Sequence, residues 1–414
     1  MSSFASPYDD LLADVGFAAN PYPAYTRLRS EAPVHWSETW HCWLLTRYED
    51  CDAVLRDTGR FTNVGRIARF LDTLSPSDRQ RARPLYDHFA AGLNHSDPPS
   101  HTRMRGLVAK ALTPKAVAAS GSRIADIVNA VIDRALPTGR MELIGDLAAP
   151  LPATVLCDLF GFPIEDQARF TGWSRDIVTF HGTGAADPDA VFQSQQAVLE
   201  ARAWLGELVA ARQREPRDDL LTALAQAEEQ GDRLDTTELL STCVTFMVGG
   251  HETTTNLIGN GMLALCRHPD VLAQLRKQPD AIDAVVEEVL RFDAPVQRAQ
   301  RLATEDVELG GRQIRQGDLV EPVLGAANRD PDRFQNPDRL RLDRGEGSHL
   351  TFGVGCHFCI GAALARLEGA IAIGTLARRL SNLRVDEGEM VAWRPNTFFR
   401  GLRHLHLRFD PTAP

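Results

Sequence analysis

The residue best placed for chemistry is Cys359, which follows a glycine-rich turn and directly precedes a predicted helix. Unpaired backbone N–H groups and the positive end of a helix dipole favour the thiolate form of a cysteine in such a position. Gly353 and Gly355 allow positive φ angles and a close approach of the backbone to a flat macrocycle, which a Cβ atom would hinder. We therefore predict that Cys359 is a thiolate ligand of a metal ion.

Cys356 and Cys359 also form a C-x-x-C pair, which in other proteins can be half of a zinc site or a redox disulfide. A zinc site needs two more ligands, and the other cysteines, at positions 42, 51, 157, 243 and 266, contain no second close pair. A thioredoxin-like site needs a βαβ context that the flanking sequence does not have. These alternatives stay open, and Cys356 is otherwise expected to be an incidental, partly buried thiol.

A second group of residues able to do chemistry lies in the segment Gly249-Gly-His-Glu-Thr-Thr254. Two glycines inside a helix cost about 1 kcal/mol each relative to alanine, which suggests a purpose. We predict that the helix is locally opened there, leaving carbonyl groups free and room for a small ligand beside Glu252 and Thr253. The alternative is that the threonine hydroxyls only pack against the helix.

These groups need elements to position them. A long apolar segment over 235–267 predicts a central buried helix, with Asp235 and Glu238 as a capping-box-like start and His268-Pro269 as its end. Further helices are predicted over about 281–292 and 361–379, and strands over 34–37, 43–46, 307–309 and 319–324. The fold class is therefore mainly α with smaller β regions, including a small sheet on the N-terminal side. Without repeats or linkers, we expect a single domain over 1–414.

The bulk composition is that of an ordinary globular protein, with 43% hydrophobic and 24% charged residues. The net charge of −10 opposes general attraction to nucleic acid or to an anionic membrane. The N-terminus has neither a signal-peptide pattern nor a spanning segment, and the seven scattered cysteines do not resemble a disulfide framework. A cytoplasmic protein is expected.

The segment Phe352-Gly-x-Gly-x-His-x-Cys-x-Gly361 resembles the haem-binding signature of the cytochrome P450 family and matches every fixed position of its bacterial form. The resemblance implies the cytochrome P450 fold, with haem b (iron protoporphyrin IX) ligated by Cys359 and O2 as co-substrate. Gly249–Thr254 resembles the oxygen-activation groove of the family. It implies that Thr253 hydrogen-bonds the oxygen being activated and that Glu252 relays protons from solvent.

Haem carries two propionates, which need cationic or donor partners. By the same resemblance, these are His101 and Arg105 in the segment after Asp97-Pro-Pro, together with Arg301 and His357. The other cofactor contacts implied by the motifs are Gly249, Phe352, Gly353, Gly355 and Gly361.

Glu288 and Arg291 lie three residues apart on one helix face, where a surface ion pair would contribute only about 0.2 to 0.5 kcal/mol. In the cytochrome P450 family, which this sequence resembles, a Glu-x-x-Arg motif forms a buried network with an arginine from a later segment. That segment resembles Phe334-x-x-Pro337-Asp-Arg339, so Arg339 is expected to be the third member.

Electrons are expected from a separate protein, because the haem domain uses all 414 residues and no cysteine spacing suits an iron–sulfur cluster. The resemblance implies a ferredoxin and an NAD(P)H-dependent ferredoxin reductase, with docking on a basic patch of Arg105, Lys110 and Arg366. Those charges could equally be a solvated surface.

A medium or large hydrophobic organic substrate is implied, because the segments expected to wall the pocket are mostly apolar. They are the segment after Gly65, the region around Phe180, and 244–248, 295–297 and 396–399. Gln297 and Asn396 are the candidate orienting groups.

The preferred interpretation is a haem-thiolate monooxygenase that inserts one oxygen atom from O2 by hydroxylation or epoxidation. Alternatives are coupling, desaturation or peroxide-driven chemistry, the last opposed by the Glu252/Thr253 pair. Outside enzymes, a haem sensor or carrier and a zinc-structured binding module remain. One departure from the family pattern is Val320-Glu-Pro322, where proline predicts an edge or bulged strand position.

Overall fold

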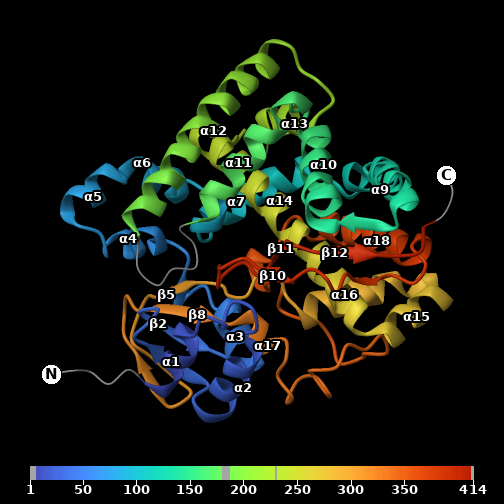
Figure 1. Cartoon of the computed structure of the whole chain (residues 1–414). Helices are drawn as coiled ribbons and strands as arrows, with labels where there is room; N and C mark the ends of the chain where they lie inside the picture. Colours follow the sequence, from blue (N-terminus) through green and yellow to red (C-terminus); the bar gives the residue numbers. More distant parts are fainter. Residues whose placement is uncertain (1–5, 180–186, 229–230, 412–414) are drawn as a thin grey trace.

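The computed structural model describes residues 6–179, 187–228 and 231–411, and a long helix runs through the middle of the molecule (Figure 1). This helix, α14, spans Thr236–Arg267 and comprises 32 residues. The predicted capping box is present, because the Asp235 side chain accepts from the Glu238 N–H and the Glu238 side chain accepts from the Asp235 N–H. The predicted central helix is therefore confirmed.

The main sheet combines strands from distant parts of the chain in the order β1-β2-β8-β5-β3. Its strands are β1 Val34–Ser37, β2 Cys42–Leu45, β8 Leu319–Pro322, β5 Arg301–Ala303 and β3 Phe61–Thr62. β2 and β8 are parallel, and the other neighbours are antiparallel. In Figure 1 the sheet lies beside the N-terminal helices at the lower left. The strands expected at 34–37, 43–46 and 319–324 are confirmed to within two residues.

The prediction that Pro322 occupies an edge or bulged position is wrong. β8 is the middle strand of the five, and Pro322 is its last residue. Its missing N–H costs no ladder bond there, because β5 pairs with β8 only through Leu319 and Val320. The carbonyl of Pro322 still accepts a hydrogen bond from the Ala299 N–H, with N···O 2.9 Å.

The helices α16, Ile282–Phe292, and α18, Ala362–Arg379, pack closely against α14 and confirm the other two predicted helices. A Cβ atom added to Gly261 of α14 would come within 2.9 Å of Ile373 and 3.1 Å of Val289. Glycine at position 261 therefore permits the close contact of these three helices. In Figure 1, α15 and α9 lie on the same right-hand side of the molecule as α16 and α18.

The remaining elements complete a mainly helical molecule. The other helices of four residues or more are α1 Pro7–Ala13, α2 Tyr22–Glu31, α3 Tyr48–Arg56, α4 Arg66–Leu71, α5 Pro76–Arg81, α6 Arg83–Ala90, α7 Ser100–Ala111, α8 Pro114–Ala119, α9 Gly121–Ala135, α10 Pro150–Phe160, α11 Gln167–Val178, α12 Pro188–Arg214, α13 Leu220–Gln226, α15 Pro269–Lys277, α17 Leu324–Ala327 and the π-helical turn Ile144–Ala148. The small sheets contain β6 Val307–Leu309 and β7 Arg312–Ile314; β10 Ala392–Trp393 and β11 Leu402–His404; and β4 Arg140–Glu142, β12 His406–Arg408 and β9 Arg384–Val385. Within the described residues, no helix combines the length and apolar character needed to cross a membrane.

The hydrophobic core divides along α14. Its residues up to Met247 belong to one large cluster with α10, α11 and α12, and its residues from Leu257 onward belong to another with α9, α16 and α18. No apolar residue of α14 is fully buried between these limits, and the buried residues there are polar: His251, Glu252, Thr254, Thr255 and Asn256. The interval contains Gly249 to Thr254, so the core leaves space where the sequence predicts chemistry.

Candidate active site

The turn that carries Cys359 leads directly into α18, whose N-cap is Gly361. A hydrogen bond from the Cys359 N–H to the Phe352 carbonyl, with N···O 2.8 Å, closes the turn. Gly353 and Gly355 have φ angles of +68° and +71°, where a residue with a Cβ is strained. The expected positive φ angles of these two glycines are confirmed.

Cys359 faces a cavity of about 360 Å³ that lies between this turn and the middle of α14. The cavity brings together most of the predicted site residues, namely Cys359, Thr253, Gly249, His101, Arg105, Arg301, Phe352, Gly353, His357 and Gly361. Gly355 and Glu252 are not among its lining residues. Segments from four distant parts of the chain thus meet around one space.

Burial raises the pKa of the Cys359 thiol above its ordinary value. The N–H groups of Gly361 and Ala362 and two nearby guanidinium groups lower this pKa, but they are outweighed. The N–H groups therefore act in the predicted direction, but the loss of solvent around the sulfur is the larger effect. A metal ion bound at the sulfur would supply the missing stabilisation.

The C-x-x-C pair is not brought into one metal cluster within the described part of the chain. Cys356 instead lies with His101 and His357, whose possible ligand atoms are all within 4.8 Å of one another. All seven cysteines are free thiols. Cys356 is partly buried, as predicted.

One end of the cavity gathers the guanidinium groups of Arg66 and Arg301, neither of which forms an ion pair within the described part of the chain. Arg301 is buried, and burial lowers its pKa to about 10. Arg66 also lines the cavity, and burial followed by repulsion from Arg301 lowers its pKa to about 9. The Nδ1 atom of His101 and the Nε atom of Arg301 are buried and have no hydrogen-bond partner among the residues that the structure describes. A bound molecule with two carboxylates would satisfy this end, which fits the propionates of haem.

Two partners of His357 were missed by the sequence analysis. His357 Nε2 lies 2.9 Å from Asn63 Nδ2 and 3.6 Å from Asp97 Oδ1. Although burial opposes it, hydrogen bonds from His357, Thr62 and Asn63 hold the pKa of Asp97 well below its ordinary value. The only sequence signal for this carboxylate was its place four residues before His101. Asp97 therefore orients the imidazole at the rim of the cationic end.

The middle of α14 supplies the opposite wall. The Thr253 hydroxyl donates to the Gly249 carbonyl, with O···O 2.6 Å, and both residues line the cavity. The helix is α-helical without interruption through this segment, so the predicted local opening is not observed. Instead, the Thr253 hydroxyl is hydrogen-bonded to the Gly249 carbonyl. Because position 249 has no side chain, the space beside the helix there is open.

Glu252 is buried, but unlike Thr253 it does not line the cavity. Its carboxylate forms an ion pair with Arg394, whose side chain is 27% exposed. Arg394 belongs to the C-terminal segment beside β10 and had no role in the sequence analysis. The ion pair links a buried acid on α14 to the surface of the molecule.

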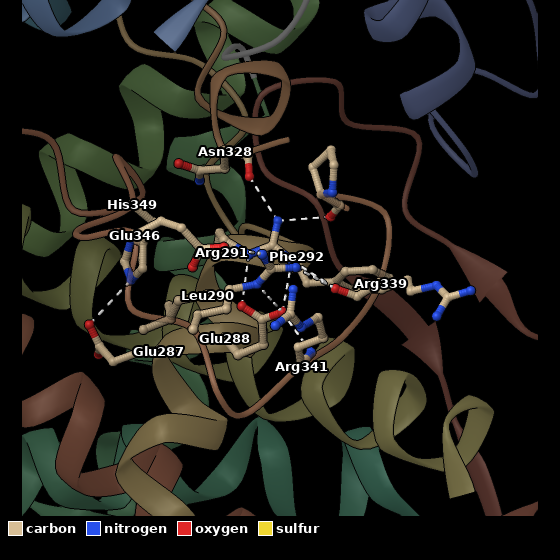
Figure 2. Close-up of polar contacts among 12 residues, drawn as sticks. Glu287, Glu288, Leu290, Arg291, Phe292, Asn328, Arg339, Arg341, Glu346 and His349 are labelled. Carbon is tan, nitrogen blue, oxygen red and sulfur yellow. Dashed lines mark hydrogen bonds and ion pairs between the residues drawn. The ribbon is translucent and has the colours of Figure 1, made fainter. Parts of the chain in front are cut away.

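Beneath the cysteine turn, Glu288 and Arg291 form a fully buried, two-bond ion pair on α16. The Arg291 guanidinium also donates to the carbonyls of Asn328, Pro337 and Arg339, as Figure 2 shows. The predicted buried pair is therefore confirmed, and it fixes the chain that runs beneath the cavity.

The prediction that the Arg339 side chain is the third member of this network is wrong. Figure 2 shows the Arg339 side chain extending away from Glu288, and only its carbonyl takes part. The third member is Arg344, whose Nε donates to Glu288 Oε1 with N···O 2.8 Å. The chain passes Glu288 at position 341, where the Arg341 N–H donates to Glu288 Oε1 with N···O 2.8 Å.

The predicted pocket walls are correct only in part. Pro295, Val296 and Phe246 line the cavity, whereas Phe180 lies outside the described residues. Gln297 is buried behind the wall and donates to the Ala294 carbonyl.

Asn396 is not among the residues that line the cavity, and its Oδ1 accepts from the N–H groups of Phe398 and Phe399. Arg298 and Gln300 are two polar residues that do line the wall near Pro295 and Val296, and both are hydrogen-bonded to the buried Glu321 of β8. This gives Glu321 a role that the sequence did not reveal.

The three cations of the predicted docking patch all have partners. Arg366 forms a two-bond ion pair with Glu287, with N···O distances of 2.6 and 3.0 Å. Arg105 donates to the Phe358 carbonyl, and Lys110 donates to a main-chain carbonyl. The charge of Arg366 is therefore partly neutralised.

Comparison with known proteins is consistent with this geometry. The model of the family described as "Cytochrome P450" matches residues 189–396. The chain is 42% identical over 406 residues to the cytochrome P450 monooxygenase PikC of Streptomyces venezuelae, covering 95% of this chain and 92% of that protein. It is 36% identical over 397 residues to the polyketide biosynthesis cytochrome P450 PksS of Bacillus subtilis, covering 94% and 96%. The chain belongs to the cytochrome P450 family.

Solved structures agree. P450BioI, in a complex with an acyl carrier protein that carries hexadec-9Z-enoic acid, superposes with a TM-score of 0.87 at 34% identity, covering 95% of this chain and 98% of that chain. The protein is thus a cytochrome P450 monooxygenase with haem as cofactor and O2 as co-substrate, and it acts with an organic substrate and redox partners. The expected fold, activity and cofactor are confirmed, against the sensor and zinc-module alternatives.

Replacing Arg344 and Arg339 separately by alanine tests which of them belongs to the network around Glu288. Arg344→Ala should lower the free energy of unfolding by about 2–3 kcal/mol, because the buried Glu288 loses a charged donor. Arg339→Ala should change it by less than about 0.5 kcal/mol, because only the backbone of Arg339 takes part. Urea denaturation of both variants measures the difference. Equal losses in the two variants would contradict this assignment.

Proposed function

We propose that this monooxygenase inserts one oxygen atom into an unactivated C–H bond or a double bond of a medium or large hydrophobic molecule. The observation that carries the proposal is the cavity, in which an apolar wall lies opposite the only cavity-lining thiol among the described residues. The whole chain, 1–414, acts as one haem domain. The free cysteines support a cytoplasmic location.

Haem, when bound, supplies an iron centre that activates O2 with electron donation from a thiolate. Cys359 is the proposed ligand, because its sulfur faces the cavity at the start of α18. His101, Arg105, Arg301 and His357, with Arg66 as a further cation, hold the two propionates. Phe352, Gly353, Gly355 and Gly361 shape the turn against the macrocycle, and Gly249 keeps the facing helix clear.

Thr253 and Glu252 are the proposed proton-handling residues. The Thr253 hydroxyl lies at the cavity wall and can turn from the Gly249 carbonyl to present its proton to the oxygen being reduced. Glu252 holds the next proton. Its pairing with the partly exposed Arg394 supports exchange with solvent at the outer end.

A ferredoxin and its NAD(P)H-dependent reductase are the proposed electron donors. Arg105, Lys110 and Arg366 remain the candidate docking residues, because Arg105 and Arg366 lie close enough to Cys359 to affect its pKa. An acidic partner would compete with Glu287 for Arg366. Docking should therefore weaken with rising salt concentration.

The substrate class is proposed to be an oxygenated, polyketide-like molecule. Leucine and phenylalanine side chains are the commonest apolar residues of the cavity lining, and Arg298 and Gln300, which are held by Glu321, add polar groups to it. Such a wall suits a hydrophobic skeleton with carbonyl or hydroxyl acceptors. The similarity to PksS, whose name includes polyketide biosynthesis, points the same way.

A substrate screen tests this proposal. Macrolides and polyketide lactones, terpenoids, fatty acids and small aromatics are added to the oxidised holoprotein, and the spin-state change of the haem is recorded. We expect the oxygenated macrocycles to bind most tightly. Bound compounds are then turned over with ferredoxin, reductase, NADPH and labelled O2. A product without one labelled oxygen atom would contradict the insertion chemistry.

Thr253→Ala tests the proton-handling role. We expect oxidant consumption to continue while product per NADPH falls by about tenfold or more, because the hydroxyl no longer delivers protons. Thr255→Ala is the matched control, since the Thr255 hydroxyl makes the same kind of bond to the His251 carbonyl but does not line the cavity. Full coupling in Thr253→Ala would show that the role is wrong.

A further inference from the structure

Glu321 is a buried acid on β8, in the segment where the sequence departs from the family pattern. It is 3% exposed and is not among the residues that line the cavity. Its two oxygens each accept from a side chain that does line the cavity. Oε2 accepts from Arg298 Nη1, and Oε1 accepts from Gln300 Nε2 with N···O 2.7 Å. One carboxylate behind the wall thus holds two polar side chains of the wall.

The main chain supports the same arrangement. Ala299 lies between the two wall residues, and its N–H donates to the carbonyl of Pro322, the residue after Glu321, with N···O 2.9 Å. The segment 298–300 therefore runs beside the end of β8. Arg298 and Gln300, on either side of Ala299, reach the same carboxylate, so their polar groups lie close together.

Arg298 is held on several sides, and its charge is balanced. Its guanidinium carbon lies 3.9 Å from the centre of the Trp40 ring, and Nη2 donates to Thr397 Oγ1 with N···O 2.9 Å. In the ion pair with Glu321 the two side chains are only 3% and 4% exposed. Arg298 Nε has no hydrogen-bond partner among the described residues. The guanidinium group can therefore donate to a ligand without requiring a second carboxylate.

The amide group of Gln300 has a single orientation. A carboxylate accepts hydrogen bonds and does not donate them, so the amide nitrogen of Gln300 is the atom that must face Glu321. The amide oxygen is then the end that remains for a ligand in the cavity, and it can only accept. Without Glu321, either end of the amide could turn toward the cavity. The acid behind the wall therefore decides the hydrogen-bonding character of Gln300.

We propose that Arg298 and Gln300 are specificity-determining residues for the substrate, and that Glu321 is the residue that positions both. Gln300 accepts from a substrate hydroxyl, and Arg298 donates to a nearby carbonyl. The ligand class is a hydrophobic molecule with a hydroxyl and a carbonyl a few bonds apart, as in a β-hydroxy ester or ketone. The molecule is neutral at this point, because Glu321 already balances Arg298. Such recognition rests on the proposed function and narrows its substrate class.

Three probes that share one carbon chain test the recognition: methyl 3-hydroxydodecanoate, methyl dodecanoate and dodecanoate. Each is titrated calorimetrically into the oxidised holoprotein. The hydroxy ester should bind about five- to tenfold more tightly than the unsubstituted ester, because it adds one hydrogen bond. Equal affinities of the two esters, or no binding of the hydroxy ester, would overturn the proposal. Tightest binding of dodecanoate would also overturn it, because Arg298 would then act as an unbalanced cation.

Gln300→Leu tests the acceptor. This variant should lose the preference for the hydroxy ester, while its affinity for methyl dodecanoate stays nearly unchanged. Gln297→Leu is the matched control and should keep the preference, since Gln297 is buried but does not line the cavity. A preference that survives in Gln300→Leu would mean that the hydroxyl binds elsewhere, and the assignment would fail.

Glu321→Gln tests the positioning role, because it keeps the shape of the side chain but leaves Arg298 unbalanced and lets the Gln300 amide turn. The affinity for dodecanoate should rise about tenfold, and the preference for the hydroxy ester should fall. Where this variant does not bind haem, the double variant Arg298→Met/Glu321→Leu takes its place, because neither charge is then buried alone. It should also lose the preference. Unchanged affinities in a folded variant would show that Glu321 is only structural.

These titrations involve no turnover. Their failure would therefore leave oxygen insertion standing, and a failure of oxygen insertion in the labelled O2 experiment would leave the binding preference to be read by itself.

Discussion

The protein buries cationic charge that it does not itself neutralise. Arg66 and Arg301 lie at one end of the cavity without an ion pair in the described residues, and burial lowers the pKa of each. Such an arrangement is costly in the empty protein and becomes favourable when two carboxylates enter. The division of the core along α14 leaves the required space, and the Cys359 turn closes it. The buried arginines, the gap in the core along α14 and the Cys359 turn are thus all explained by the binding of haem.

The chain beneath the cavity is organised by a different kind of burial. Glu288 and Arg291 neutralise each other on α16, and Arg344 adds a second guanidinium to the same carboxylate. The remaining donors of Arg291 and Arg344 bind main-chain carbonyls of the segment before the cysteine turn. Because each lost contact would leave a buried charge short of a partner, this segment has little freedom to move. The position of the sulfur depends on that rigidity.

Local patterns in the sequence predicted local structure well. The capping box of α14, the positive φ angles of Gly353 and Gly355 and the Glu288/Arg291 pair follow from residues close together in the chain. The errors concern partners chosen by tertiary packing. Arg344 rather than Arg339 reaches Glu288, and the roles of Arg66 and Glu321 were not predicted, while Asp97 was marked only by its place four residues before His101. The N–H groups near Cys359 lower its pKa as predicted, but the larger effect of burial could not be predicted, because the number of protein atoms around a sulfur is a property of the whole fold.

The central claim is that Cys359 is the thiolate ligand of the haem, and the spectrum of the reduced protein with carbon monoxide tests it most directly. The unaltered protein and Cys356→Ser should both show the long-wavelength Soret band of a thiolate-ligated haem. Cys359→Ser should lose that band even when haem remains bound. A long-wavelength band that survives in Cys359→Ser, or one that disappears in Cys356→Ser while haem is retained, would contradict the account.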